Sequence, residues 1–490
     1  MSADADLGTP DVLSTPQAGG LIIRGSVLRV VGYGAGIVLL AAASVVLLRH
    51  LGVVRFGQYV TVMSIVAVAS TIADAGLTVV GSRELALLPP GEARHRLLGN
   101  ILGVRMVVAP LGVAGAVVFA ALAGYPGSMV LGTLLAGFGL MLTTWQGTLM
   151  LGPMVELRNG RVTLVEVAKQ VLTVLGIAVL AAAGAALTPF FAVPILVGVA
   201  IVALSRPLLG RGALMLPRRE REVWRPLIRE ALPIAAAFVL VTLYLRVVVV
   251  LMSLISSEHE TGLFGTSFRI LESLTQIPTL LAGIALPLLT AAARDDHERL
   301  RYALQRFTEV GTLCAALIVV VTALAADSIV VVLGGSQYAA AADVLRIQAC
   351  ALLGIFLSQF WSSALIALRR QRELIAVNGV ALVGLGLLAA VLIPRWGAKG
   401  GALASVLGDL LLAGLLLWRL RGAGPAGRLR FGFAWRVLAA TAVALTPGFV
   451  PGLWEPAAAL AGIALFAGAA LVLGVIPEEL PAALRAGRRR

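Results

Sequence analysis

Residues 242–252 read TLYLRVVVVLM and place one arginine, Arg246, in an otherwise apolar run that covers about residues 229–256. A helix needs about 20 apolar residues to cross the hydrocarbon core of a membrane, so this run is long enough. A charge at mid-bilayer depth costs about 3 kcal/mol on insertion scales. The stretch therefore predicts a membrane span whose arginine faces protein, water or a partner rather than lipid.

The whole chain has the composition of a multi-pass membrane protein. Of its 490 residues, 59% are hydrophobic and 13% are charged, and the mean hydropathy is +0.97. A soluble domain of this size needs more polar surface. Cys314 and Cys350 lie in apolar runs and predict buried thiols rather than a disulfide or a metal pair. The four histidines are scattered, so we expect no catalytic residue, no metal site and no cofactor.

Fourteen apolar runs are long enough, or nearly so, to be transmembrane helices. The class predicted is therefore all-α, with about 14 transmembrane helices. The thirteenth run is short. Their approximate limits are 25–48, 58–80, 100–123, 128–150, 162–183, 189–209, 229–256, 263–291, 308–333, 343–368, 374–393, 398–418, 435–450 and 456–476.

The positive charge follows the sides of a membrane. With a cytoplasmic N-terminus, 29 of the 39 lysines and arginines fall in inner segments, 4 in outer segments and 6 within spans. This asymmetry is the positive-inside pattern, so we expect a cytoplasmic-membrane protein with both termini cytoplasmic and no nucleic-acid partner, despite a net charge of +14. The predicted span ends carry tryptophans, as an interfacial belt requires: Trp224, Trp396, Trp418, Trp435 and Trp454.

A short motif recurs in the two halves of the chain. RFGQY (55–59) opens the second span and GLFGTSFR (262–269) opens the eighth, on either side of a long charged connection. We therefore predict two six-helix lobes related by a pseudo-two-fold repeat. The predicted organisation is a disordered tail (1–24), an N-terminal lobe (25–209), a cytoplasmic linker (210–228), a C-terminal lobe (229–420), a cytoplasmic loop (421–434), two extra helices (435–476) and a basic cytoplasmic tail (477–490).

Three stretches carry a family resemblance: LGVVRFGQYVTVMSIVAVASTIADAGLTVVGSREL (51–85), VLGGSQYAAAADVLRIQ (332–348) and WGAKGGALASVLGDLLL (396–412). They resemble the polysaccharide flippases of the multidrug/oligosaccharidyl-lipid/polysaccharide (MOP) exporter superfamily. The resemblance implies a central cationic cavity and alternating access. It also implies Arg-x-Asp on the seventh helix, but here Val248 stands where the aspartate would be after Arg246.

The first predicted site lies on the seventh and eighth spans, which a short outer loop makes antiparallel neighbours. Arg246 and Glu272 each lie about 14 Å below the outer ends of their helices, so they are level. Arg269 shares a helix face with Glu272. We expect Glu272 to pair with Arg246 and leave one uncompensated positive charge for substrate phosphates. A purely structural ion-pair network is the alternative.

A second set of charges lies nearer the cytoplasmic helix ends. Arg29 and Arg105 either line the cavity or snorkel to the inner surface. Carboxylates inside spans suit proton or cation coupling, and simple burial is the alternative. The residues predicted for ion coupling are Asp74, Glu166, Lys169 and Asp409.

The sequence favours a transporter that flips a lipid-linked oligosaccharide of the polyprenyl-phosphate type, with a glycan polymerase or glycosyltransferases and membrane lipids as further partners. An ion-coupled exporter of small cations or drugs is an alternative, although it calls for a more acidic cavity. A membrane glycosyltransferase, a polymerase or a scaffold of glycan assembly is another. Glycosyl transfer needs carboxylates on a sizeable outer loop, and the predicted outer loops have about ten residues or fewer.

Overall fold

The computed structural model describes residues 18–89, 91–156, 159–209, 216–295, 297–422, 424 and 427–475, and within these ranges the secondary structure is helical. Eleven helices are long and apolar enough to cross a membrane. A helix satisfies the hydrogen-bonding groups of its own backbone, and lipid tails offer no partners for them. The chain is therefore a multi-pass membrane protein.

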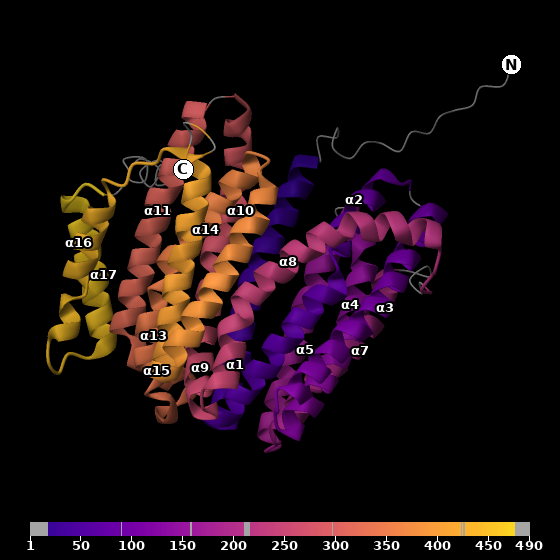
Figure 1. Ribbon diagram of the computed structural model, residues 1–490, viewed down its shortest axis with the longest axis horizontal. Coiled ribbons are helices and arrows are strands. Elements are labelled where there is room, and N and C mark those ends of the chain that lie inside the picture. Colours follow the sequence, from indigo (N-terminus) through magenta and orange to yellow (C-terminus); the bar gives the residue numbers. More distant parts are fainter. Residues whose placement is uncertain are drawn as a thin grey trace.

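The first half of the chain forms one group of helices, and Figure 1 shows most of it on one side of the molecule. Helix α1 runs along the boundary with the second half and packs against helices of both. The elements are α1 (Ala18–Asp74), α2 (Leu77–Leu87), α3 (Glu92–Leu122), α4 (Gly127–Val155), α5 (Asn159–Ala182), α6 (Leu187–Phe190) and α7 (Val193–Leu209).

The second half forms the other group, with α8 running obliquely between the two groups and α16 and α17 on the far flank beside α11 (Figure 1). The elements are α8 (Arg221–Ile255), α9 (Glu258–Leu274), α10 (Gln276–Asp295), α11 (His297–Leu324), α12 (Ala326–Gly334), η2 (Ser336–Tyr338), α13 (Ala341–Ala349), α14 (Ala351–Ala367), α15 (Gln371–Arg421), α16 (Ala434–Ala444), η4 (Thr446–Phe449) and α17 (Glu455–Val472). The predicted lobe boundaries and the repeat stay predictions.

Two of the longest helices contain a break at a glycine. Gly52 in α1 has φ 73° and ψ 172°, and Gly397 in α15 has φ 52° and ψ −129°. Glycine accepts positive φ without a Cβ clash. At the second break, Glu260 Oε2 accepts a hydrogen bond of 2.6 Å from the amide of Ala398 and occupies the place of a side chain at Gly397. The breaks divide α1 and α15 into two helical segments each.

The predicted number of spans is not settled by these elements. Helix α16 has 11 residues, which is too short to count among the eleven candidate spans. Fourteen therefore stays a prediction. Residues 221–228, predicted as part of a linker, are instead the first two turns of α8, where Glu222 lies in the first turn and favours a helix start.

The connection before α8 is fastened to α3. The amide of Arg218 donates to the carbonyl of Gly99 at 2.8 Å, and the amide of Glu220 donates to Asn100 Oδ1 at 3.0 Å. Arg96 Nε donates to the Glu220 carboxylate at 2.6 Å, and this bond holds the pKa of Glu220 below its ordinary value. The described part of the predicted linker therefore lies against the first group of helices.

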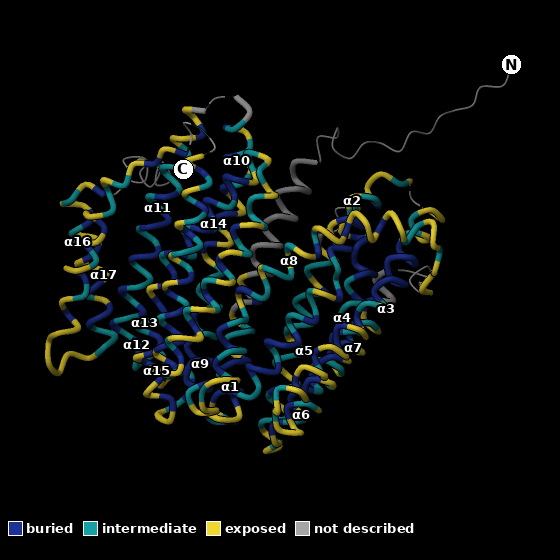
Figure 2. The backbone as a smooth tube through the Cα atoms, in the orientation of Figure 1, coloured by how far each residue is buried: buried dark blue, intermediate teal, exposed yellow. Residues whose placement is uncertain are grey.

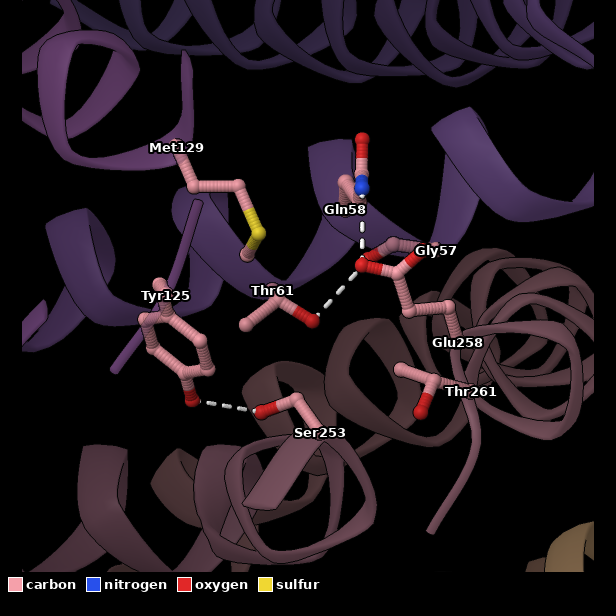
Figure 3. A pocket seen from close by; sticks show the side chains of 8 residues that line it. All are labelled: Gly57, Gln58, Thr61, Tyr125, Met129, Ser253, Glu258 and Thr261. Atoms are coloured by element: carbon pink, nitrogen blue, oxygen red, sulfur yellow. Dashed lines mark hydrogen bonds between the residues drawn. The ribbon is translucent and has the colours of Figure 1, made fainter. Parts of the chain in front are cut away.

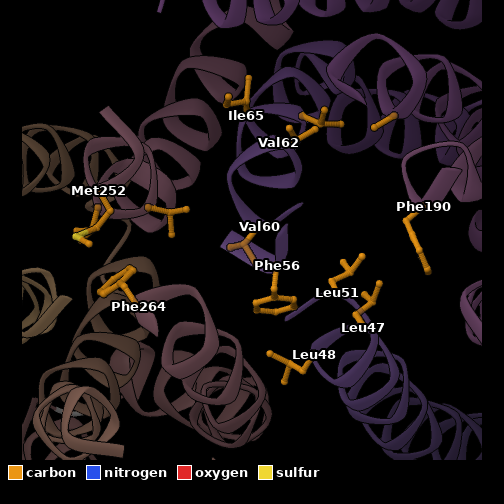
Figure 4. Close-up of a cluster of buried hydrophobic side chains, with 14 of the residues drawn as sticks. Leu47, Leu48, Leu51, Phe56, Val60, Val62, Ile65, Phe190, Met252 and Phe264 are labelled. Carbon is orange, nitrogen blue, oxygen red and sulfur yellow. The ribbon is translucent and has the colours of Figure 1, made fainter. Parts of the chain in front are cut away.

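The largest buried cluster joins the two halves at the lower end of the molecule as drawn. Phe56 and Phe264, the aromatic residues of the two repeated motifs, are both fully buried in it, and Figure 4 shows them with Leu48, Leu51 and Met252. Burial of one such side chain contributes about 1.5–3 kcal/mol. Figure 2 shows buried residues at this end, near α1 and α9, with exposed residues around them. The motifs that suggested a repeat therefore supply a shared core.

Outward faces of the helices are apolar, as contact with lipid requires. Large hydrophobic side chains there are more than half exposed, and Figure 2 shows exposed positions along these faces. Examples are Val383 and Leu438. The prediction that both cysteines are buried is wrong for Cys350, which is exposed, while Cys314 is half-buried.

Candidate functional site

Three charged side chains form a cluster where α8 and α9 lie antiparallel. Arg246 of α8 donates to Glu272 Oε1 at 2.6 Å, and Arg269 of α9 donates to Glu272 Oε2 at 2.7 Å. About one fifth to one quarter of each side chain is exposed. The contact predicted between Arg246 and Glu272 is therefore present, and one carboxylate serves two guanidinium groups.

The cluster reaches the first half of the chain through a hydroxyl. Arg269 Nε donates to Ser44 Oγ of α1 at 3.0 Å. Arg246 lies over the ring of Phe268 at 5.4 Å. Among the described residues, Glu272 is the one hydrogen-bond acceptor of the Arg246 guanidinium, so most of its five donors are available to a ligand.

On one side of the cluster lies a polar cavity of about 360 Å³ between α8, α9, α10, α14 and α15. It combines carboxylates, amides and hydroxyls with apolar walls. Its polar lining residues are Tyr244, Arg246, Glu272, Thr275, Gln276, Thr279, Gln348, Gln359, Ser405 and Asp409. Sites of this kind bind ligands through a few convergent polar groups.

On the other side lies an apolar groove of about 740 Å³ between α1, α3 and α8. Ile65, Leu111 and Phe119 are among its lining residues, together with Leu382 of α15. Arg246 is the one charged side chain among the described residues that line it, and Arg246 also lines the polar cavity. This arginine is therefore shared by an apolar and a polar space.

Asp409 has a phenol as its partner rather than a charge. Tyr244 Oη donates to Asp409 Oδ1 at 2.8 Å, and both residues line the polar cavity. The two side chains come from α8 and from the second segment of α15. Among the described residues, no ion pair involves Asp409. It is thus placed where a proton or cation could reach a carboxylate whose charge is uncompensated.

Asp74 and Arg105, predicted for different roles, are partners. Arg105 pairs with the carboxylate of Asp74, and its side chain is 2% exposed, so it does not snorkel to the surface. It is absent from the lining of the polar cavity and of the apolar groove, and its predicted place in a substrate cavity stays a prediction. Arg105 also donates to Thr78 at 2.6 Å and to Thr148 at 2.7 Å, which links α1, α2, α3 and α4. A buried guanidinium needs these acceptors because desolvation costs several kcal/mol.

The remaining predicted residues lie elsewhere. Glu166 and Lys169 pair with each other at 2.5 Å along α5, with 46% and 30% of their side chains exposed. Within the described part of the chain, no ion pair or hydrogen bond joins them to the Arg246 cluster or to Asp409. Arg29 lies in α1, but its side chain is outside the described residues.

The other polar groups have only weak signals in the sequence. Ser44, Gln348, Gln359 and Tyr244 are single polar residues in apolar runs. A polar residue in a span predicts burial against protein but not which helix it meets. The partners of these residues could therefore be identified only from the three-dimensional structure.

At the lower end in Figure 1, the two halves close on each other. A Cβ on Gly57 would lie 2.7 Å from the amide nitrogen of Gly262, so the backbones of α1 and α9 are in direct contact. Gln58 donates to Glu258 at 2.9 Å, and Tyr125 and Ser253 share a hydrogen bond of 2.7 Å (Figure 3). The space between these side chains is only about 30 Å³, which is too small to hold a ligand.

Comparison with solved structures identifies the fold. The solved structure of the lipid II flippase MurJ, in an inward closed conformation, matches with a TM-score of 0.69 and 11% identity, over 91% of this chain and 98% of that one. An inward-facing multidrug resistance MATE transporter matches with a TM-score of 0.63 and 12% identity, over 80% and 95%. The chain has the fold of the MOP-superfamily transporters. At these identities the likeness shows the fold alone.

A sequence comparison adds a family match over part of the chain. Residues 156–343 match the family described as "Polysaccharide biosynthesis protein". A further MOP-superfamily transporter, from Pyrococcus furiosus, matches with a TM-score of 0.52 and 13% identity over 83% of this chain and 95% of that one, and it is described as having a binding pocket of reverse polarity. A search of curated proteins gives no match. The predicted resemblance to this superfamily and to polysaccharide biosynthesis is thereby confirmed.

Proposed function

We propose that this MOP-superfamily transporter flips a lipid-linked oligosaccharide, carried on an anionic polyprenyl phosphate, from the inner to the outer leaflet of the cytoplasmic membrane. The observation that carries the proposal is the shared position of Arg246, between an apolar groove of about 740 Å³ and a polar cavity of about 360 Å³. A substrate with a lipid chain, a phosphate and a glycan has the same three parts in the same order.

The charge of the cluster suits a phosphate. Two guanidinium groups share one carboxylate, so Arg246, Arg269 and Glu272 together carry one net positive charge. Guanidinium groups bind phosphate oxygens through two parallel hydrogen bonds, and Arg246 has donors to spare. The groove would hold the first part of the lipid chain, while amides and hydroxyls of the cavity would bind sugar hydroxyls.

The side of entry follows from charge and closure together. The positive-inside pattern assigns the closed end of Figure 1 to the outer face and places both termini in the cytoplasm. Closure of that end by Gly57, Gly262 and the large shared core supports entry from the inner leaflet. Rocking of the two halves would then open the outer side, which is alternating access.

Asp409 is the residue that would couple transport to a proton or cation gradient. A carboxylate bonded to a phenol can take up a proton or a cation without first breaking an ion pair, unlike Asp74, which is held by Arg105. Asp409 lines the same cavity as Arg246 and Glu272, so its charge acts directly on the substrate site. A glycan polymerase or glycosyltransferase would use the flipped product or supply the substrate.

A second candidate function is export of small organic cations, and Asp409 is the observation that favours it. An isolated carboxylate in a cavity attracts cations. The Arg246 cluster opposes it because its net charge is positive and cations would be repelled. The two functions differ in the sign of the substrate, which makes them easy to separate.

The test uses purified protein in proteoliposomes. A fluorescent disaccharide on polyprenyl pyrophosphate is the first probe, and ethidium is the second. We expect the lipid-linked probe to change leaflets and ethidium to stay, and ethidium transport alone would establish the second candidate instead.

A matched pair of variants tests the groove. Gly115 lines it and has open space around an added Cβ, so Gly115→Phe fills the groove without a backbone clash. Gly414 in α15 also has open space and lines none of the described cavities, so Gly414→Phe is the control. We expect flipping to fall at least tenfold in Gly115→Phe and to persist in Gly414→Phe. Equal activity of the two variants would contradict a lipid chain in the groove.

A further inference from the structure

A second pocket lies far along the chain from the substrate site, where α11 begins and the connection between α15 and α16 passes. It has a volume of about 190 Å³ and is lined by Arg301, Tyr302, Gln305, Arg428 and Arg430. Three of the five residues are arginines and none is acidic. The pocket is therefore strongly cationic. It has no role in the proposed transport cycle.

The three arginines have no anionic partner within the described part of the chain. Among the described residues, no ion pair or hydrogen bond is made by the guanidinium groups of Arg301, Arg428 and Arg430, and the bonds of Arg430 with Gln305 involve its backbone. Glu309, which bonds to the pocket residue Gln305 at 2.8 Å, is also paired with Arg306 at 2.9 Å. Like charges gathered in this way repel one another unless an anion joins them.

Hydrogen bonds and aromatic packing hold the wall of this pocket in place. Gln305 Nε2 donates to the carbonyl of Arg430 at 2.8 Å, and the amide of Arg430 donates back to Gln305 Oε1 at 2.9 Å. Leu429 is buried, and Phe431 meets the ring of Trp361 edge-on at 6.4 Å. The backbone that carries Arg428 and Arg430 is thus fixed opposite Arg301.

Two exposed tryptophans place the pocket at the level of lipid headgroups. Trp418 near the end of α15 is 62% exposed, and Trp435 in the first turn of α16 is 59% exposed. They flank the connection that carries Arg428 and Arg430. Tryptophan is enriched at the membrane–water interface, where one side of the ring is apolar and the other is wet. Each ring also lies under a guanidinium, Arg419 or Arg436.

We propose that this pocket binds the phosphodiester headgroup of an anionic phospholipid of the surrounding membrane. Basic pockets at helix ends on the cytoplasmic side suit such headgroups, and each arginine near the surface contributes about 1 kcal/mol. Tyr302 also lines the pocket, and a phenol hydroxyl can hydrogen-bond a glycerol or phosphate oxygen, whereas Gln305 uses both of its N–H donors to hold the pocket together. The bound lipid would join α11 to the connection before α16. This inference does not depend on the transported substrate.

The test measures which lipid stays bound to the purified full-length protein. Native mass spectrometry would compare phosphatidylglycerol with phosphatidylcholine of the same acyl chains. We expect one retained phosphatidylglycerol, and a preference that falls about fivefold for each arginine replaced in Arg301→Gln, Arg428→Gln and Arg430→Gln. Arg299 is exposed on the same helix and lines no described cavity, so Arg299→Gln is the control with the same charge change.

Two further arms separate the explanations. Gln305→Met keeps all three arginines but removes both bonds to Arg430, and we expect it to lose the preference as well. Inorganic phosphate alone should not raise the unfolding temperature, whereas phosphatidylglycerol should. Protection by phosphate alone would make this a site for soluble anions and overturn the lipid assignment. An equal loss in Arg299→Gln would show unspecific attraction and overturn the pocket.

Discussion

Arg246 and Glu272 meet at 2.6 Å across two antiparallel helices, and Arg269 holds the other oxygen of the same carboxylate at 2.7 Å. Removal of either arginine therefore leaves Glu272 with a partner. This arrangement separates a role in binding from a role in folding, because an unpaired buried charge destabilises a protein whereas a lost ligand contact does not.

The first prediction is that Arg246→Ala accumulates normally but loses flipping. Arg269 still pairs with Glu272, so the free energy of unfolding should change little. Arg246→Lys should keep partial activity, because a charge remains without the planar pair of donors. Protein level and flipping in proteoliposomes are the measurements. If Arg246→Ala fails to accumulate while Arg246→Met with Glu272→Met restores level and activity, the cluster is structural.

The second prediction concerns the contact that closes the outer end. A Cβ on Gly262 would overlap the carbonyl of Val53, so Gly262→Ala must push α1 and α9 apart. At Gly265, one turn away, a Cβ would lie 3.5 Å from Val60, which is ordinary contact. We expect Gly262→Ala, but not Gly265→Ala, to favour outward opening. Labelling of a cysteine at Thr61 by an impermeant thiol reagent would report it, and equal labelling would refute it.

The third prediction assigns energy coupling to Asp409. Asp409→Asn cannot take up a proton or cation charge, so an imposed ion gradient should no longer accelerate transport. Tyr244→Phe keeps the carboxylate but removes its 2.8 Å hydrogen bond, and we expect a smaller loss. Transport rates with and without proton or sodium gradients measure this. Unchanged gradient stimulation in Asp409→Asn would remove Asp409 from the mechanism.

The fourth prediction treats Asp74 and Arg105 as a structural pair. Asp74→Asn leaves a guanidinium that is 2% exposed without its anion, so we expect a loss of about 3–5 kcal/mol in stability. Arg105→Met with Asp74→Leu should recover much of it. Thermal unfolding in detergent measures both. A stable Asp74→Asn variant with defective transport would instead support the coupling role predicted from the sequence.

The fifth prediction tests the sidedness of the chain. Cysteines at Ser128, Ser257 and Ser336, in a background without Cys314 and Cys350, should react with an impermeant thiol reagent in intact cells. A cysteine at Arg219 should not. All four positions are exposed, so the contrast depends on the side of the membrane alone. The reverse pattern would invert the assignment of the closed end.

The sequence alone predicts the parts of the site whose residues lie on neighbouring helices of the chain. Arg246 and Glu272 lie on consecutive spans joined by two residues, so the helix rise alone predicts that the two residues lie at the same depth in the membrane. Asp74 and Arg105 lie on spans separated by a whole helical segment, and Tyr244 and Asp409 by 165 positions. Their pairing depends on how helices cross, which hydropathy does not encode. The break at Gly397 likewise depends on Glu260, from a distant helix.

The bond from Glu260 to the amide of Ala398 ties the first turn of α9 to the second segment of α15. Any pivot at the outer end must leave these two segments as one rigid piece, since separating them would expose an unbonded amide inside the break. If the two halves rock against each other, we therefore expect the motion to occur between this piece and α1, where Gly57 meets Gly262. A carboxylate far from the substrate would thus decide which surfaces slide and which stay locked.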